Sequence, residues 1–69
     1  MIMQGLSLDV LRNGRKYCLI NHGERFEFEI EYILSNGDFK VKDLHTLEHY
    51  LLKDLISPGK GKDFEIREI

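Results

Sequence analysis

Alternation of apolar and polar residues between positions 25 and 34, broken only at Ile33, is the strongest constraint that this sequence places on its fold. The apolar set is Phe26, Phe28, Ile30, Tyr32 and Leu34. Because successive side chains of a β-strand point to opposite faces, this spacing predicts a strand with one apolar face. Most positions between them are acids, Glu27, Glu29 and Glu31, so we expect the other face to be solvated.

Short turn signals divide the rest of the chain into segments of similar length. Asn36-Gly37 favours a two-residue type I′ turn, because both residues tolerate the positive φ that this turn requires. Asn13-Gly14 predicts a first hairpin of the same kind, and residues 21–24 predict a looser third turn. The strands expected between these boundaries are 15–20, 25–34, 38–43 and 64–69, and one interpretation of the segment 44–56 adds a strand at 48–53.

A two-residue turn would also fix the register of the strands that flank it. At Asn36-Gly37 it predicts the cross-strand pairs Leu34–Phe39, Tyr32–Val41 and Glu31–Lys42. The same register puts Asp43 on the apolar face, so we expect the strand to bulge, bend or stop near 42–43. At Asn13-Gly14 it predicts the pairs Val10–Tyr17 and Leu8–Leu19.

The segment 44–56 has two interpretations. As a helix, which local propensity favours, it places Leu44, Leu47, Leu51 and Leu55 on one stripe, and Ser57-Pro58-Gly59 ends it. As a strand, it bends near His45, runs from 48 to 53 and finishes in a single turn at 54–56. The first interpretation gives an α+β domain, a four-stranded antiparallel meander plus one helix. The second gives five strands.

A resemblance supports the five-stranded interpretation. The motifs that carry it are Val41-Lys42-Asp43-Leu44, Tyr50, Asp54-Leu55-Ile56 and Gly59-Lys60-Gly61-Lys62-Asp63-Phe64. Over about residues 15–69 the chain resembles small uncharacterised bacterial proteins of the SH3-like or Tudor-like barrel type. This resemblance implies a mainly β, five-stranded, partly open barrel with a short helical turn. It implies no activity and no site residue, and the chain lacks the tryptophan of SH3 peptide binders.

Length, charge and cysteine content narrow the class of function. A chain of 69 residues forms one domain, 1–69, and buries only about 60% of its surface, which leaves little core for a deep active site. A net charge of −2 provides no general attraction for nucleic acid or an anionic membrane. The single Cys18 excludes an internal disulfide and suits a reducing cytoplasm. We therefore expect a cytoplasmic protein without enzymatic activity or cofactor.

Two histidines form the nearest approach to a metal motif. His45 and His49 are four residues apart with Glu48 between them, a spacing that can place two imidazoles on one ion. A further ligand would have to come from His22 or Cys18, and nothing in the sequence brings either one there. We expect no metal site.

Loops are the expected binding regions. We expect a protein-interaction module that meets its partner through the loops 35–38 and 57–63. The candidate partner-binding residues are Asn36, Asp38, Lys60 and Lys62. The alternative is nucleic-acid binding through the basic loop residues, and the cations it would use are Lys60, Lys62, Arg12, Arg15 and Lys16. The negative net charge disfavours that alternative.

Overall fold

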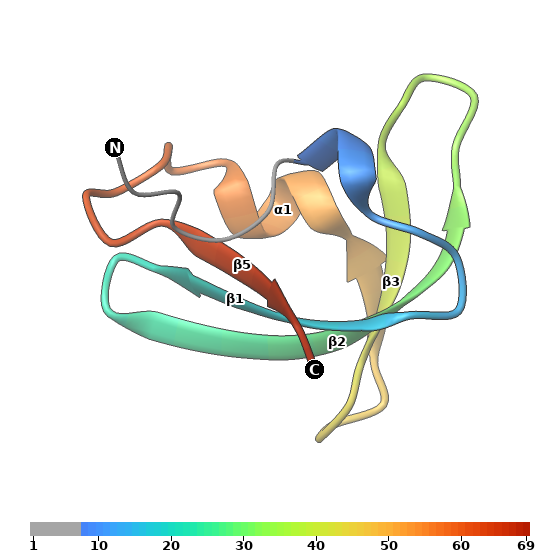
Figure 1. Cartoon of the computed structure of the whole chain (residues 1–69), viewed down its shortest axis with the longest axis horizontal. Helices are drawn as coiled ribbons and strands as arrows, with labels where there is room; N and C mark the ends of the chain where they lie inside the picture. Colours follow the sequence, from blue (N-terminus) through green and yellow to red (C-terminus); the bar gives the residue numbers. More distant parts are fainter. Residues whose placement is uncertain (1–7) are drawn as a thin grey trace.

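The computed structural model describes residues 8–69, which form one antiparallel sheet and two short helices (Figure 1). The strands are β1 (Lys16–Asn21), β2 (Glu24–Ile33), β3 (Phe39–Asp43), β4 (His49–Leu51) and β5 (Glu65–Glu68). The 3₁₀ helix η1 (Leu8–Val10) precedes β1, and the α-helix α1 (Leu52–Ile56) lies between β4 and β5. The order in the sheet is β4-β3-β2-β1-β5. The prediction of a mainly β domain with five strands is confirmed.

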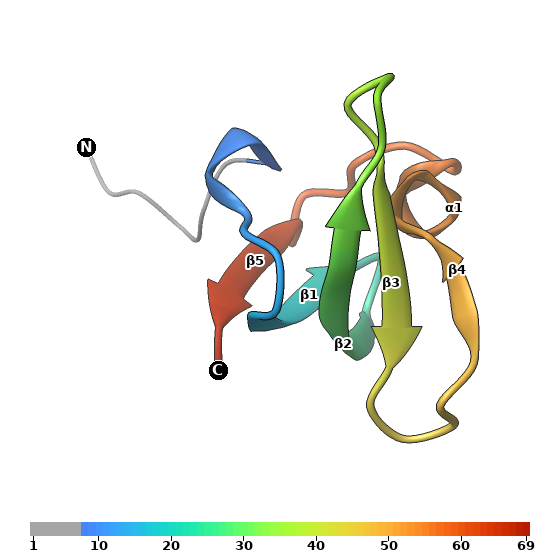
Figure 2. The same ribbon diagram turned by 90° about the vertical axis from the view of Figure 1, so that its right-hand side faces the viewer.

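Strand β2 is the longest strand and is shared by the two halves of the sheet. Its residues from Glu24 to Glu29 pair with β1, and those from Phe28 to Ile33 pair with β3. The sheet bends along β2, so β1 and β5 run across the view of Figure 1 while β3 rises steeply from them. Both α1 and η1 lie on the inner side of this bend (Figures 1 and 2).

The apolar core fills the inner side of the bend. Phe28 and Ile30 of β2 are fully buried there, as their alternation predicts. The other buried core residues are Leu11, Tyr17, Leu19, Phe39, Val41, Leu52 and Ile66. The Tyr17 hydroxyl oxygen accepts a hydrogen bond from the backbone N–H of Arg12 at 2.9 Å, so this large side chain is buried with its polar end satisfied. One continuous set of contacts therefore holds both halves of the sheet.

The tight type I′ turn lies at His22-Gly23 rather than at an Asn-Gly pair. His22 has φ 52° and Gly23 has φ 76°, and Asn21 pairs with Glu24 directly across them. Both central residues of a type I′ turn need positive φ, and this turn matches the twist of the strands it joins. The segment predicted as the loosest turn is therefore the tightest hairpin.

The β2–β3 hairpin has a three-residue loop, so the predicted two-residue turn at Asn36-Gly37 is wrong. The N–H of Leu34 donates to the carbonyl of Asp38 at 2.8 Å, which leaves 35–37 as the loop. Gly37 has φ 89°, whereas Asn36 is not in the positive-φ region. This loop suits a type I turn followed by a glycine in the left-handed region.

The longer loop shifts every predicted β2–β3 pair. The predicted pairs Leu34–Phe39, Tyr32–Val41 and Glu31–Lys42 are replaced by Ile33–Phe39, Tyr32–Lys40, Ile30–Val41 and Glu29–Lys42. A bulge between Ile30 and Tyr32 accounts for the second shift in register. The bulge reverses the alternation of β2, so Tyr32 is half exposed instead of facing the core. Strand β3 ends at Asp43, where we expected it to bulge, bend or stop.

The predicted first hairpin is wrong, because residues 8–10 form η1 instead of a strand. The turn at 13–14 is instead hydrogen-bonded to β2. The N–H of Gly14 donates to the carbonyl of Ile30 at 2.8 Å, and the N–H of Ile30 donates to the carbonyl of Arg15 at 3.0 Å. The neighbours of β1 in the sheet are β2 and β5. No edge of β1 is left for the predicted pairs of Leu8 and Val10 with Leu19 and Tyr17.

The structure confirms a strand followed by a short helix within 44–56, and the helix over this whole segment is wrong. The strand is shorter than the predicted 48–53, because residues 52 and 53 already belong to α1. Strand β4 and helix α1 follow each other directly, and the N–H of Asp43 donates to the carbonyl of Glu48 at 2.8 Å to close the β3–β4 hairpin. The expected leucine stripe is not the buried face, since Leu47 is exposed and Leu52 is buried. Within residues 8–69, no helix is long and apolar enough to cross a membrane.

Leu47 occupies an unfavourable backbone conformation in the β3–β4 hairpin. Its φ is 64°, in the left-handed region that costs an L-residue roughly 1–2 kcal/mol. Leu47 is 62% exposed, so the packing of its side chain offsets little of this backbone cost. The turn around it is fixed by Asp43, whose carboxylate accepts hydrogen bonds from the N–H groups of His45 at 2.7 Å and Thr46 at 2.9 Å.

Leu47→Gly should therefore stabilise the protein. Glycine adopts this φ without a steric penalty, and we expect the free energy of unfolding to rise by about 0.5–1 kcal/mol in urea titrations. The matched control is Glu48→Gly, at an exposed neighbour without positive φ, where glycine should lower stability. A loss of stability in Leu47→Gly would show that the Leu47 side chain contributes more than its exposure indicates.

Candidate functional site

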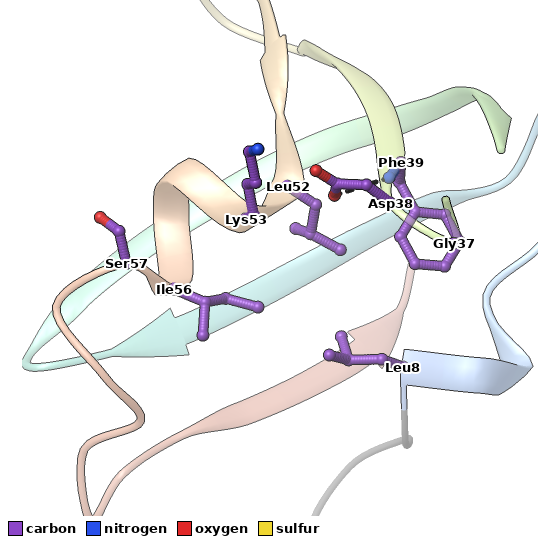
Figure 3. A pocket seen from close by; sticks show the side chains of 8 residues that line it. All are labelled: Leu8, Gly37, Asp38, Phe39, Leu52, Lys53, Ile56 and Ser57. Carbon is purple, nitrogen blue, oxygen red and sulfur yellow. Dashed lines mark hydrogen bonds between the residues drawn. The ribbon is translucent and has the colours of Figure 1, made fainter. Parts of the chain in front are cut away.

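An apolar groove opens between α1 and the β2–β3 hairpin. We call it the α1 groove, and its volume is about 510 Å³. Its lining residues are Leu8, Gly37, Asp38, Phe39, Leu52, Lys53, Ile56 and Ser57. Figure 3 shows the side chains of Leu8, Phe39, Leu52 and Ile56 directed into one shared space. This size falls within the range of pockets that receive small ligands or a few side chains.

The apolar surface of the groove is formed by one face of α1 together with buried core residues. Leu52 and Ile56 are four residues apart in α1 and therefore share a helix face. Phe39 is only 7% exposed and Leu52 only 1%, so both belong to the core as well as to the groove. Leu8 of η1 and Ile56 are partly buried at the sides. A guest in the α1 groove would rest directly on the hydrophobic core.

Three polar residues line the same groove. Asp38 lies at the end of the β2–β3 loop, and its Oδ1 accepts a hydrogen bond from the N–H of Phe39 at 2.7 Å. Lys53 is exposed in the first turn of α1. Ser57 follows the helix, and its hydroxyl donates to the carbonyl of Asp54 at 3.2 Å. The polar atoms of Asp38 and Lys53 can therefore orient a ligand whose apolar part fills the floor.

The structure separates the four predicted partner-binding residues. Asp38 lines the α1 groove, whereas Asn36 lies in the adjoining turn and accepts a hydrogen bond from the N–H of Asp38 at 3.0 Å. Lys60 and Lys62 lie in the loop after α1, outside the groove lining. The Nζ of Lys60 is 5.0 Å from the centre of the Phe64 ring, a cation–π distance.

The loop 57–63 is held in place by the β1–β2 hairpin. Asn21 is only 2% exposed, and its side chain bridges two points of the loop: Nδ2 donates to the Gly59 carbonyl at 3.1 Å, and Oδ1 accepts from the Gly61 N–H at 2.8 Å. Asp63 reaches back in the other direction and accepts the N–H groups of His22 at 2.8 Å and Gly23 at 2.7 Å. The backbone of this predicted binding loop is thus fixed by internal hydrogen bonds.

Asn21→Ala should lower the free energy of unfolding by about 2 kcal/mol, because it leaves loop backbone groups without their buried partner. Urea denaturation measures the loss, and faster hydrogen exchange at the Gly61 amide locates it. The matched control is Asn13→Ala, at an exposed turn position, where we expect a change within about 0.5 kcal/mol. Equal effects of the two substitutions would contradict a bridging role for Asn21.

The cations of the alternative nucleic-acid site do not form one patch. Figures 1 and 2 place the segment 12–16 and the loop 57–63 on opposite sides of the molecule. Arg15 is also engaged, since its Nη1 lies 2.6 Å from Oε2 of Glu68. Lys60 and Lys62 therefore lack the support that Arg12, Arg15 and Lys16 were expected to give.

The histidines pair with acids of the outer face of β2 rather than with each other. Nε2 of His45 lies 2.6 Å from Oε1 of Glu27, and Nδ1 of His49 lies 2.7 Å from Oε1 of Glu31. Within residues 8–69, no cluster of three or more metal-ligating side chains occurs. Cys18 is buried in β1, and the His22 ring contacts the Gly59 carbonyl at 2.7 Å.

Hydrogen bonds to charged carboxylates lower several pKa values. The N–H groups of Gly23 and His22 lower the pKa of Asp63 below its ordinary 3.8, and those of Thr46 and His45 lower the pKa of Asp43. His45 and Arg25 lower the pKa of Glu27. In each case the hydrogen-bond donors favour the ionised form. Burial, together with the charge of Asp43, raises the pKa of Tyr50 to about 12.

These lowered values predict a loss of stability in acid. Because the folded-state pKa of Asp63 lies below 3.8, the unfolded chain takes up the proton first as pH falls. The stabilisation is therefore complete above pH 3.8 and is lost as pH falls through the folded-state value. Asp63→Asn should flatten the pH dependence of the urea midpoint between about pH 2 and pH 5. Glu24→Gln, at an exposed strand end, should leave that dependence as steep as in the wild type.

Sequence reasoning missed most of the α1 groove. Phe39, Leu52 and Ile56 carry no chemical motif, and Leu52 was excluded from the expected leucine stripe. The signal that could have found them is the pair Leu52 and Ile56 just before Ser57-Pro58-Gly59, which marks a short helix with one apolar face. The position of Leu8 opposite α1 had no local signal at all.

Comparison with known protein families, characterised proteins and solved structures finds no match for this chain. The case for a function therefore rests on the geometry of the residues described above.

Proposed function

We propose that this chain is a small protein-interaction module that binds an apolar segment of a partner protein in the α1 groove. The observation that carries the proposal is an open groove whose floor, Phe39 and Leu52, is part of the hydrophobic core. Buried apolar anchors in such pockets contribute most of the energy of many interfaces. We propose binding rather than catalysis, in a reducing cytoplasm.

The fold we propose is an SH3-like, partly open barrel. Three features support this: the strand order β4-β3-β2-β1-β5, the bend of the sheet along β2, and a short helix just before the last strand. Barrels of this class bind along loops or an open edge rather than in a deep pocket. The α1 groove lies between a hairpin loop and the helix, which agrees with that kind of site.

The α1 groove also joins the two loops that the sequence predicted as binding regions. Gly37 and Asp38 belong to the loop 35–38, and Ser57 begins the loop 57–63. The remainder of the second loop, including Lys60 and Lys62, does not line the groove. We therefore place the partner on the face formed by Asp38, Phe39 and α1.

Substitutions in the groove should weaken capture of the partner. We expect Ser57→Phe, which fills the mouth from an exposed position, and Ile56→Glu, which places a charge on the apolar side of the groove, to reduce partner binding about tenfold or more. The measurement is quantitative affinity capture by equal amounts of each tagged variant from native lysate that is divided into a nuclease-treated and an untreated half. Circular dichroism confirms that each variant is folded.

The matched control is Ile69→Glu, which changes an isoleucine that is 56% exposed and lies outside the groove lining. It should capture the partner as well as the wild type. Equal capture by all variants would place the interaction elsewhere on the surface. Recovery of nucleic acid, or loss of the captured protein on nuclease treatment, would instead favour nucleic-acid binding.

A further inference from the structure

One carboxylate oxygen in the wall of the α1 groove has no partner. Oδ1 of Asp38 accepts the N–H of Phe39 at 2.7 Å, but Oδ2 is enclosed and accepts no hydrogen bond from residues 8–69. Figure 3 shows this carboxylate turned toward α1, beside the apolar floor. A polar atom removed from water without a hydrogen bond is unfavourable, and almost all such atoms in proteins find a donor. A donor that enters the groove would therefore give this oxygen a hydrogen bond.

Among the residues described, Lys53 is the one cationic donor in the groove lining, and it forms no ion pair with Asp38. Its side chain is exposed to solvent. An exposed ammonium is screened by solvent and salt, whereas the enclosed oxygen of Asp38 is not. The charge preference of the groove is therefore set by Asp38, and it favours a cation.

The position of Asp38 is fixed before any ligand arrives. Its N–H donates to Oδ1 of Asn36 at 3.0 Å, and its carbonyl accepts the N–H of Leu34 at 2.8 Å. Rotation about the Cβ–Cγ bond of an aspartate meets only a shallow barrier, so Oδ2 can turn toward a guest while the backbone stays in place. Binding then requires little ordering of the protein, which favours affinity.

We propose that the partner segment carries a lysine or arginine beside the apolar side chain that fills the α1 groove, and that its cationic group donates to Oδ2 of Asp38. This inference rests on the proposed function and identifies its ligand. The methylene stem of either residue can lie along Phe39 and Leu52 while its charged end reaches the carboxylate. Hydrogen bonds between two charged groups are the stronger kind, so Asp38 determines specificity.

The test is selection of one random twelve-residue peptide library against three full-length proteins: wild type, Asp38→Asn and Glu48→Gln. The last is the matched control, because it removes an acid from an exposed loop outside the groove lining. We expect wild type and Glu48→Gln to enrich peptides that pair Leu, Ile, Met or Phe with Lys or Arg. Asp38→Asn should enrich apolar peptides without the cation.

Affinities then measure the contact directly. Replacing the selected Lys or Arg by Met should weaken binding to wild type about tenfold and leave binding to Asp38→Asn nearly unchanged. Amide chemical shifts of Phe39, Leu52 and Ile56 should move on titration of the parent peptide. Movement confined to other residues would overturn the groove as the site.

The two proposals fail in different ways. Peptides that bind in the groove but carry no cation, or that carry Asp or Glu, would overturn the role of Asp38 and leave the interaction module standing. Enrichment of the same sequences by wild type and Asp38→Asn would likewise overturn the role of Asp38 but not the interaction module. If no peptide is enriched by any of the three proteins, both the cationic ligand and the peptide-binding groove are wrong.

Discussion

The whole fold depends on the burial of two residues at the centre of one strand. Phe28 and Ile30 are fully buried in β2, which pairs with β1 on one side and with β3 on the other. Phe28 lies where the two pairings overlap, opposite Tyr17 of β1 and Asp43 of β3. The bend of the sheet along β2 lets both halves of the sheet enclose the same core. A domain of this size has room for one such core, and the α1 groove is built on its surface rather than cut into it.

Much of the fold could be predicted because it depends on patterns that are local in the sequence. The alternation through Phe26, Phe28 and Ile30 identifies β2, and alternation together with turn residues gives the approximate bounds of β1, β3 and β5. Register could not be predicted in the same way. One extra loop residue at 35–37 and one bulge at Glu31 shift the pairs twice, and neither has a distinct sequence signal.

The residues that were misplaced are those whose environment is set by distant parts of the chain. Leu8 and Val10 alternate acceptably for a strand, but β5 already occupies the neighbouring edge of β1. Local propensity favours a helix over 44–56, but the pairing of β4 with β3 makes part of this segment a strand. At the site, Asp38 was selected as a loop residue, and the structure places it in a groove with Phe39 and Leu52. Only the folded chain brings those three together.

The two walls of the α1 groove differ in how they are attached. Leu51 ends β4 and Leu52 begins α1, so the helical wall continues from the sheet without a connecting loop. Asn21 also touches the other end of that helix, through the carbonyl of Leu55 at 3.5 Å. The opposite wall is the tip of a hairpin whose regular pairing is interrupted by the bulge at Glu31. The α1 groove therefore lies between a helix that continues directly from the sheet and a hairpin whose register is irregular.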